Sequence, residues 1–175
     1  MAELWDIYDK NRNKTGRLHE RGKPMNAGEY HIVVQIWIMN SRGEFLISKR
    51  VPDMPTWPGM WQTTWGSAVA GDDSLATALK ETAEEIGIAL DLKNGRLFKA
   101  FVMPRPTDAG SAFYDVWIFR QEVDISTVVF QPTETCDAMW ASKEKIKQMV
   151  DEGMFIPPEE AFPYLDELFD FCDKL

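Results

Sequence analysis

The chain has 175 residues, a length that suits one domain with a single sizeable core. Its 28 Asp and Glu residues outnumber 19 Lys and Arg, and the formal net charge of −9 argues against nucleic-acid binding, which depends on clustered cations. Two cysteines exclude a disulfide framework, no apolar stretch approaches the ~20 residues of a membrane span, and residues 1–6 show no signal peptide. We therefore expect a cytoplasmic protein that binds neither nucleic acid nor a membrane.

The first half of the chain alternates between apolar runs and turn-forming stretches. Three strands are predicted from apolar alternation or β-branched runs, at residues 4–8, 30–39 and 44–49. Residues 9–16 are rich in turn formers, whereas the polar residues 19–29 predict an irregular segment. Residues 40–43 predict the turn of a hairpin between the second and third strands. Prolines and aromatic residues predict that 52–65 is a rigid, partly buried connector.

The second half adds helices to the pattern. Strands are predicted at 97–103 and 112–119, around a turn at 105–110, with short ones at 128–130 and 138–141. Helices are predicted at 74–86, 142–150 and 159–175, the last with Pro158 at a compatible first position. The last helix carries an apolar stripe that suits either packing on the protein's own core or a homodimer contact. The stripe consists of Phe162, Leu165, Leu168, Phe169 and Cys172. Strands that precede, flank and follow the first helix predict an α+β fold, with a mixed β-sheet between helical layers.

The first of these helices is the most informative element, because it places three carboxylates on one side. It is expected to begin after Asp73, an N-cap residue, and to end before Gly87. At about 100° per residue, Glu81, Glu84 and Glu85 fall within an arc of roughly 100°, beside the apolar face. Clustered glutamates repel one another, so a hard divalent cation among them would stabilise the arrangement. A solvated acidic face is the alternative.

The stretch from residue 66 to 88 resembles the Nudix box, G-x5-E-x7-R-E-U-x-E-E-x-G-U, where U is aliphatic. The matching residues are Gly66, Glu81, Glu84, Glu85, Gly87 and Ile88. Asp72 replaces the first glutamate, Lys80 the arginine and Thr82 the first aliphatic residue, with the spacing kept throughout. The resemblance implies a single, MutT-like Nudix domain over 1–175, folded as the Nudix-type α/β/α sandwich with a mixed β-sheet.

The resemblance also implies a reaction, the hydrolysis of a diphosphate linkage in a small molecule such as a nucleoside diphosphate derivative. Mg²⁺ or Mn²⁺ held by Glu81, Glu84 and Glu85 would bridge phosphate oxygens and lower the pKa of a bound water. Glu84 and Glu85 are the stronger candidates for direct ligands. The fourth catalytic candidate is Glu134, before an apolar strand where Nudix proteins often carry a glutamate; a solvated loop acid is the alternative. Asp137 is a second choice, and the general base stays open.

Two basic residues and several aromatic ones are candidates for substrate binding. Arg50, and Lys49 beside it, follow an apolar run, and the planar fork of an arginine suits phosphate; a surface salt bridge is the alternative. An aromatic wall for the rest of the substrate has four candidates, for each of which a core position is the alternative. These are Trp57, Trp61, Trp65 and Tyr114.

The flanks of the box resemble one Nudix branch, isopentenyl-diphosphate isomerase and its relatives. The similar stretches are 30–32, 43–46 with 49–50, 57–61 and 134–137. That isomerase moves protons at carbon with a cysteine and a glutamate, and histidines hold its metal. The family's Cys-Gly-His stands here as Trp65-Gly66-Ser67, so the cysteine and one histidine are absent. His31 matches a family histidine, but without its upstream partner it is expected to be structural.

We therefore predict an isomerase-like Nudix hydrolase, with two alternatives. One is the isomerase itself. The other is a non-catalytic, ligand-sensing Nudix domain, which the departures at Asp72 and Lys80 suggest. A lysine lacks the planar fork with which an arginine would hold the neighbouring glutamate.

Overall fold

A computed structural model describes residues 2–103 and 111–175, and the predicted turn at 105–110 lies outside them. Contacts along the chain group it into two compact units. The first unit comprises Met1–Ile36, Trp65–Glu81 and Leu97–Trp117, and the second Trp37–Thr64, Thr82–Arg96 and Ile118–Leu175. Within the described ranges, every helix is too short or too polar to cross a membrane.

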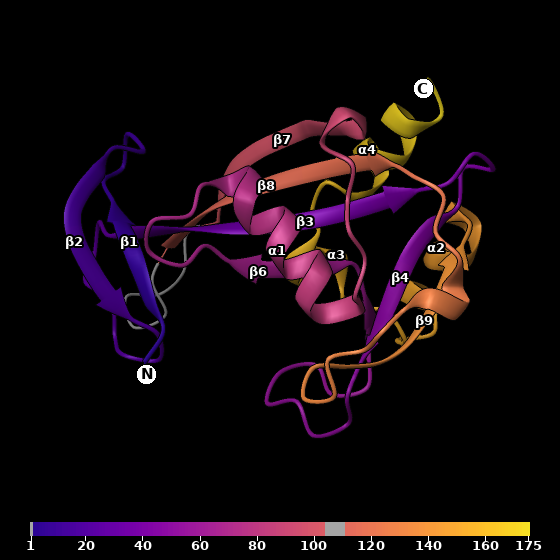
Figure 1. Ribbon diagram of the computed structural model, residues 1–175, viewed down its shortest axis with the longest axis horizontal. Helices are drawn as coiled ribbons and strands as arrows, with labels where there is room; N and C mark the ends of the chain where they lie inside the picture. Colours follow the sequence, from indigo (N-terminus) through magenta and orange to yellow (C-terminus); the bar gives the residue numbers. More distant parts are fainter. Residues whose placement is uncertain (1, 104–110) are drawn as a thin grey trace. The chain divides into compact units, whose positions relative to one another are not determined.

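The N-terminal hairpin of the first unit pairs β1 (Leu4–Tyr8) with β2 (Lys14–Glu20) in antiparallel orientation (Figure 1). The carboxylate of Asp9 holds the turn between them, because it accepts the main-chain N–H groups of Asn11 and Asn13 at 2.8 and 2.9 Å. The prediction of β1 is confirmed. The prediction of an irregular segment is wrong where β2 lies, since this mostly exposed, polar strand has no buried face that an alternating pattern would reveal.

Four further strands contribute to the sheet of the first unit. The first residue of β3 (Tyr30–Met39) pairs with the last residue of β1. β6 (Thr64–Ser67) and β8 (Ser111–Arg120) both pair with β3, and β7 (Gly95–Met103) pairs with β8. The strands predicted at 30–39, 97–103 and 112–119 are therefore confirmed. β6 begins within the last two residues of the rigid connector predicted at 52–65 and was not predicted as a strand.

Several aromatic residues of the first unit pack within its core. Trp65 and Tyr114, two candidates for a substrate wall, belong to one core cluster. The cluster consists of buried Val33, Ala112 and Tyr114 with Trp65, Phe101 and Met103 packed against them. His31 is buried, and its ring stacks on that of Trp5 with centroids 4.1 Å apart. These contacts favour the core alternative for Trp65 and Tyr114, and a structural role for His31.

Helix α1 (Ser74–Ile86) confirms the predicted helix at both ends. The side chain of Asp73 accepts the N–H of Ala76 at 2.8 Å, as an N-cap residue does. Gly87 lies in the left-handed region with φ 71°, and its N–H donates to the carbonyl of Ala83 at 3.1 Å. Glycine adopts this conformation without steric cost, which explains why the helix ends there.

The sheet of the second unit is centred on β4 (Phe45–Arg50). β9 (Thr135–Ala141) runs antiparallel to it along its whole length (Figure 1). The end of β3 and the two-residue β5 (Trp61–Gln62) share the other edge of β4. β4 and β9 confirm the strands predicted at 44–49 and 138–141, whereas β5 lies inside the predicted connector.

Helices α2 (Lys143–Asp151), α3 (Pro158–Ala161) and α4 (Leu165–Cys172) complete the second unit. Trp37 is fully buried, and its indole N–H donates to the hydroxyl of Tyr164 at 3.0 Å. Aromatic rings surround this indole, namely those of Phe45, Phe155, Phe162 and Phe169. The whole predicted stripe of the last helix is buried within the chain. Its packing on the protein's own core is therefore confirmed, and the homodimer stays a prediction.

Two predictions for the second unit are wrong. The helix expected at 159–175 is divided into α3 and α4, because Pro163 lacks an N–H and restricts the residue before it; Phe162 has the non-helical angles φ −130° and ψ 54°. The strand expected at 128–130 is an irregular segment after a 3₁₀ turn, Ile125–Thr127. Val128 and Phe130 are half-buried, whereas Val129 is exposed, and its main-chain N–H donates to the carbonyl of Ile86 and not to a neighbouring strand. The helix predicted at 142–150 is confirmed by α2, whose N-cap is Ser142.

Candidate functional site

Glu81, at the second glutamate position of the box stretch, lies directly against Gly66, the first residue of the box. Gly66 lies on β6 and Glu81 on α1, both in the first unit. A Cβ atom on Gly66 would lie 2.1 Å from the carboxyl carbon of Glu81 and 2.3 to 2.4 Å from its two oxygens. The carboxylate therefore rests directly on the glycine backbone, where any other residue would displace it.

The two charged departures from the box contact each other. Lys80 Nζ lies 3.7 Å from a carboxylate oxygen of Asp72, and both side chains are partly exposed. Such an exposed pair contributes under about 1 kcal/mol to stability. The shorter acid and the flexible lysine thus form one local pair.

The other two helix glutamates, in the second unit, have contrasting surroundings. Glu84 is exposed, whereas only 2% of Glu85 is accessible to solvent. The main-chain carbonyl of Glu85 accepts hydrogen bonds from the hydroxyl of Thr135 at 2.7 Å and the N–H of Gln131 at 3.0 Å. Neighbouring glutamates of one helix therefore combine a solvent-facing carboxylate with a desolvated one.

Arg50 is the buried cation of the second unit's candidate site, with 5% of its surface exposed. Its guanidinium donates to the carbonyl of Thr56 at 3.0 Å and to the side chain of Gln62 at 2.8 Å. Burial lowers the pKa of Arg50, and the carboxylates of Glu85 and Glu134 act in the opposite direction. The structure thus brings Arg50, Glu85 and Glu134 into one electrostatic group, with part of the arginine fork already bonded to protein.

Glu134 is half-buried and lies in a short turn before β9. Its main-chain N–H donates to the carbonyl of Gln131 at 2.9 Å, and its carbonyl accepts the N–H of Val51 at 3.0 Å. The side-chain amide of Gln131 lies 3.5 Å from a carboxylate oxygen of Glu134, the limit for a hydrogen bond. Main-chain bonds therefore fix this residue on two sides and leave its carboxylate adjustable.

The two predicted phosphate-binding residues are neighbours on β4, and the pairing of β4 with β9 shifts register between them. Arg50 lies opposite Thr135 in the register of β4 and β9. Lys49 lies opposite Trp61 on β5 and Asp137 on β9, and its ammonium is 5.9 Å from the centre of the Trp61 ring. The structure therefore groups Lys49 with Trp61 and the second-choice acid Asp137, away from Arg50.

Sequence reasoning missed the roles of Gln131, Thr135 and the backbone of Trp57. No local pattern distinguishes Gln131 and Thr135, because their partner Glu85 is distant in the sequence, 50 residues before Thr135. Trp57 has φ +47°, a left-handed conformation that costs a non-glycine residue about 1–3 kcal/mol. Its indole N–H donates to Glu160 at 3.2 Å. Pro58 biases the residue before it toward extended conformations, so the left-handed conformation of Trp57 is held by its surroundings.

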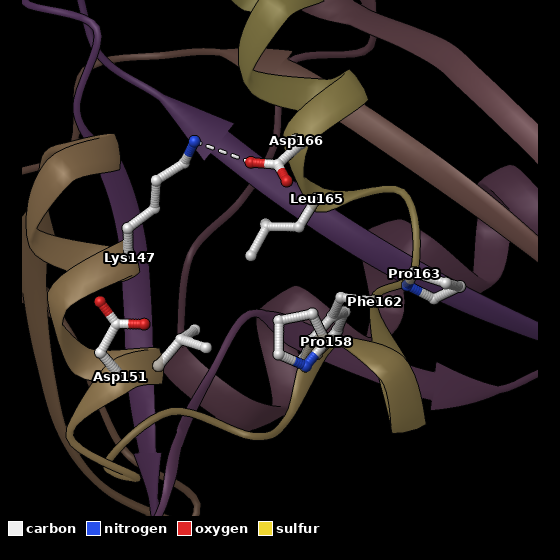
Figure 2. A pocket seen from close by; sticks show the side chains of 8 residues that line it. Lys147, Asp151, Pro158, Phe162, Pro163, Leu165 and Asp166 are labelled. Atoms are coloured by element: carbon white, nitrogen blue, oxygen red, sulfur yellow. Dashed lines mark ion pairs between the residues drawn. The ribbon is translucent and has the colours of Figure 1, made fainter.

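A separate pocket of about 330 Å³ lies among α2, α3 and α4 (Figure 2). Its lining mixes apolar and charged side chains, and Lys147 and Asp166 form an ion pair there with a separation of 2.7 Å. The lining residues are Lys147, Val150, Asp151, Pro158, Phe162, Pro163, Leu165 and Asp166. None of the predicted catalytic or substrate-binding residues is among them.

The donor chemistry of the three helix glutamates fits a hard divalent cation, because carboxylate oxygens are the ligands such ions prefer. The seating of Glu81 on Gly66 limits where one of these carboxylates can lie. Within residues 2–103 and 111–175, however, no three His, Cys, Asp or Glu side chains are already gathered around one metal-sized point.

Comparison with known proteins identifies the class. Residues 29–163 match the family model of the NUDIX domain, which is more than half of the chain. The chain is 35% identical over 169 residues to an uncharacterized Nudix hydrolase of Listeria innocua, covering 96% of this chain and 94% of that protein. The chain therefore belongs to the Nudix family, and the predicted α/β/α sandwich with a mixed β-sheet is confirmed.

Two more distant relatives bear on the details. The crystal structure of DR0079 from Deinococcus radiodurans is similar with a TM-score of 0.72, at 21% identity, over 97% of this chain and 99% of that one. The isopentenyl-diphosphate Delta-isomerase of Brevibacterium linens is 24% identical over 142 residues, 79% of this chain and 74% of the isomerase. The family model and the Listeria relative confirm the predicted enzyme class, a Nudix-type hydrolase, and the isomerase is a distant relative, as predicted.

Proposed function

We propose that this Nudix hydrolase cleaves a diphosphate linkage in a small molecule, such as a nucleoside diphosphate derivative, with the help of Mg²⁺ or Mn²⁺. The observation that carries the proposal is the contact between Gly66 and the Glu81 carboxylate, which joins the first residue of the box to its helix. Glu81, Glu84 and Glu85 would hold the ion. The ion, when bound, supplies charge to the phosphate oxygens and lowers the pKa of a water.

The protein's own groups then have distinct tasks in this proposal. Glu134 accepts a proton from the attacking water, whose oxygen bonds to one phosphorus while the bridging P–O bond breaks. The two products leave as phosphate-bearing anions, and the proton passes to solvent. Arg50, with its buried positive charge beside Glu85 and Glu134, attracts the anionic substrate to this group. The predicted contact of Lys49 with substrate belongs to the proposal on sequence grounds alone.

The isomerase alternative is disfavoured by the residue at the cysteine position. Trp65 occupies that position and packs against the core cluster of the first unit. An indole N–H does not supply the acid that a thiol supplies. Proton exchange at carbon is therefore not expected, and the distant isomerase relatives contribute a shared fold to the comparison.

The test is a hydrolysis screen with product identification over a panel of nucleoside diphosphate derivatives, in Mg²⁺ and in Mn²⁺. Glu85→Gln and Glu84→Gln should each lower kcat by at least about a hundredfold, because the amide loses the charge that holds the ion. Lys143→Gln, far along the chain on α2, is the matched control and should stay near wild type. Unaltered turnover in both glutamate variants would remove the assigned chemistry. Tight binding of a panel compound without any product would favour the ligand-sensing alternative. The cytoplasmic location and the homodimer remain predictions from the sequence.

A further inference from the structure

The end of α1 is capped by a segment that is distant in sequence. The last carbonyls of a helix have no partner within it and must find donors elsewhere. The N–H of Val129 donates to the carbonyl of Ile86 at 3.0 Å, and the N–H of Gln131 to that of Glu85 at 3.0 Å. The Thr135 hydroxyl adds a second bond to the Glu85 carbonyl at 2.7 Å. These three bonds join the helix end to the segment from 129 to 135, all within the second unit.

The same segment carries Glu134. The carbonyl of Gln131 accepts the N–H groups of both Glu134 and Thr135, at 2.9 and 3.0 Å, which closes a tight turn. The Val51 N–H holds the carbonyl of Glu134 from the side of β4. Glu134 is therefore adjacent in the chain to Thr135, whose hydroxyl donates to the Glu85 carbonyl. Two candidate carboxylates from distant parts of the chain are connected by a short path of hydrogen bonds.

We propose that Thr135 is a positioning residue, whose hydroxyl bond to the Glu85 carbonyl sets the place of Glu134 relative to the end of the box helix. This inference rests on the proposed function. Thr135 is 1% exposed, so its hydroxyl depends on a protein partner. Its β-branched side chain has few rotamers, which makes the link stiff. Of the three bonds to the helix end, it is the one that a side-chain substitution removes.

The link matters because proton transfer depends on distance. A general base acts within hydrogen-bond reach of the water it deprotonates, and a displacement of about 1 Å reduces the rate by as much as a hundredfold. Glu85 itself stays on α1 and keeps the bond from Gln131. Loss of the hydroxyl therefore affects the loop that carries Glu134 more than the helix that carries the proposed metal ligands.

The test compares Thr135→Val, which keeps the shape and loses the donor, with Thr135→Ser, which keeps the donor. We expect kcat of the Val variant to fall about tenfold to a hundredfold, with KM and Mn²⁺ affinity within about twofold of wild type. The Ser variant should recover most of kcat. Thr135→Ala, which lacks the donor at a different volume, should behave like Thr135→Val.

A second measurement does not depend on turnover. Hydrogen exchange of the Glu134 amide should be faster in Thr135→Val than in wild type or Thr135→Ser, with Mn²⁺ binding followed in the same samples by electron paramagnetic resonance. Equal kcat and equal exchange in the Val and Ser variants would overturn the inference while leaving the proposed function intact. A wild-type protein that neither binds Mn²⁺ nor hydrolyses any panel compound would instead overturn the proposed function.

Discussion

The contact between Gly66 and Glu81 predicts that Gly66→Ala impairs activity while leaving the fold nearly unchanged. The added methyl carbon would lie 2.1 Å from the Glu81 carboxyl carbon. Since carbon atoms normally approach no closer than about 3.5 Å, the carboxylate must retreat by more than about 1 Å. The clash falls on the far end of a flexible side chain, which can rotate away. Gly66 does not have a positive φ, so alanine brings no backbone strain.

The expected magnitudes follow from these geometric facts. Replacing glycine by alanine at a compatible position changes the free energy of unfolding by about 1 kcal/mol or less, and in the stabilising direction through the unfolded chain. A metal–oxygen bond, by contrast, tolerates only about 0.2 Å. We therefore expect kcat/KM to fall about a hundredfold, and Mn²⁺ affinity to fall in parallel. Urea unfolding, calorimetric Mn²⁺ titration and steady-state kinetics measure the three quantities, and Ser67→Ala on the same strand is the control.

A double-mutant cycle decides whether the effect passes through Glu81. In Glu81→Ala the carboxylate is already gone, so adding Gly66→Ala should cause little further loss. Additive losses would show that the alanine acts by another route. Full activity of Gly66→Ala would refute the reasoning altogether, because it would mean that the seat of the carboxylate has no bearing on catalysis.

Two further predictions concern thiol reactivity and pH. Burial raises the pKa of Cys172 to about 11, whereas Cys136 is exposed. Titration of the native protein with a thiol reagent should therefore modify Cys136 rapidly and Cys172 only after unfolding; fast modification of both would contradict the packing of α4. The hydrogen bonds from Lys14 and from the N–H of Gly71 hold the pKa of Asp6 below its ordinary value of 3.8. Ionised Asp6 therefore stabilises the fold above that pH, and this contribution is lost as pH falls below it. Measured against pH, the unfolding free energies of wild type and Asp6→Asn should converge in acid, and parallel curves would contradict this.

Local signals made some elements predictable from the sequence and left others hidden. Both ends of α1 were predicted because Asp73 and Gly87 act through bonds within a few residues. The break between α3 and α4 also has a local cause, Pro163, which the apolar stripe across it outweighed in the prediction. β2 lacks a buried face, so no periodicity marks it. A helix end that is fixed by nearby residues can be predicted from the sequence, whereas an exposed strand without a buried face cannot.

The residues of the candidate site also differ in how far the sequence predicts them. The spacing of the box places Glu81, Glu84 and Glu85 on one helix, and a single sequence suffices for that. The hydrogen-bond partners of Arg50, and the bond from the Thr135 hydroxyl to the Glu85 carbonyl, depend on strand register and on contacts between distant parts of the chain. A sequence pattern carries no such information, because any polar residue before a strand would look the same.

The departures at Asp72 and Lys80, which motivated the non-catalytic alternative, have a simple physical reading. An arginine has a planar fork that can hold a neighbouring carboxylate, and a lysine does not. Here the lysine ammonium lies beside Asp72, which replaces the first glutamate of the box. The two changed residues form one partly exposed pair, and the Glu81 carboxylate lies against Gly66. Because that contact is steric and does not depend on the charge at position 80, replacing Lys80 should affect catalysis far less than replacing Gly66.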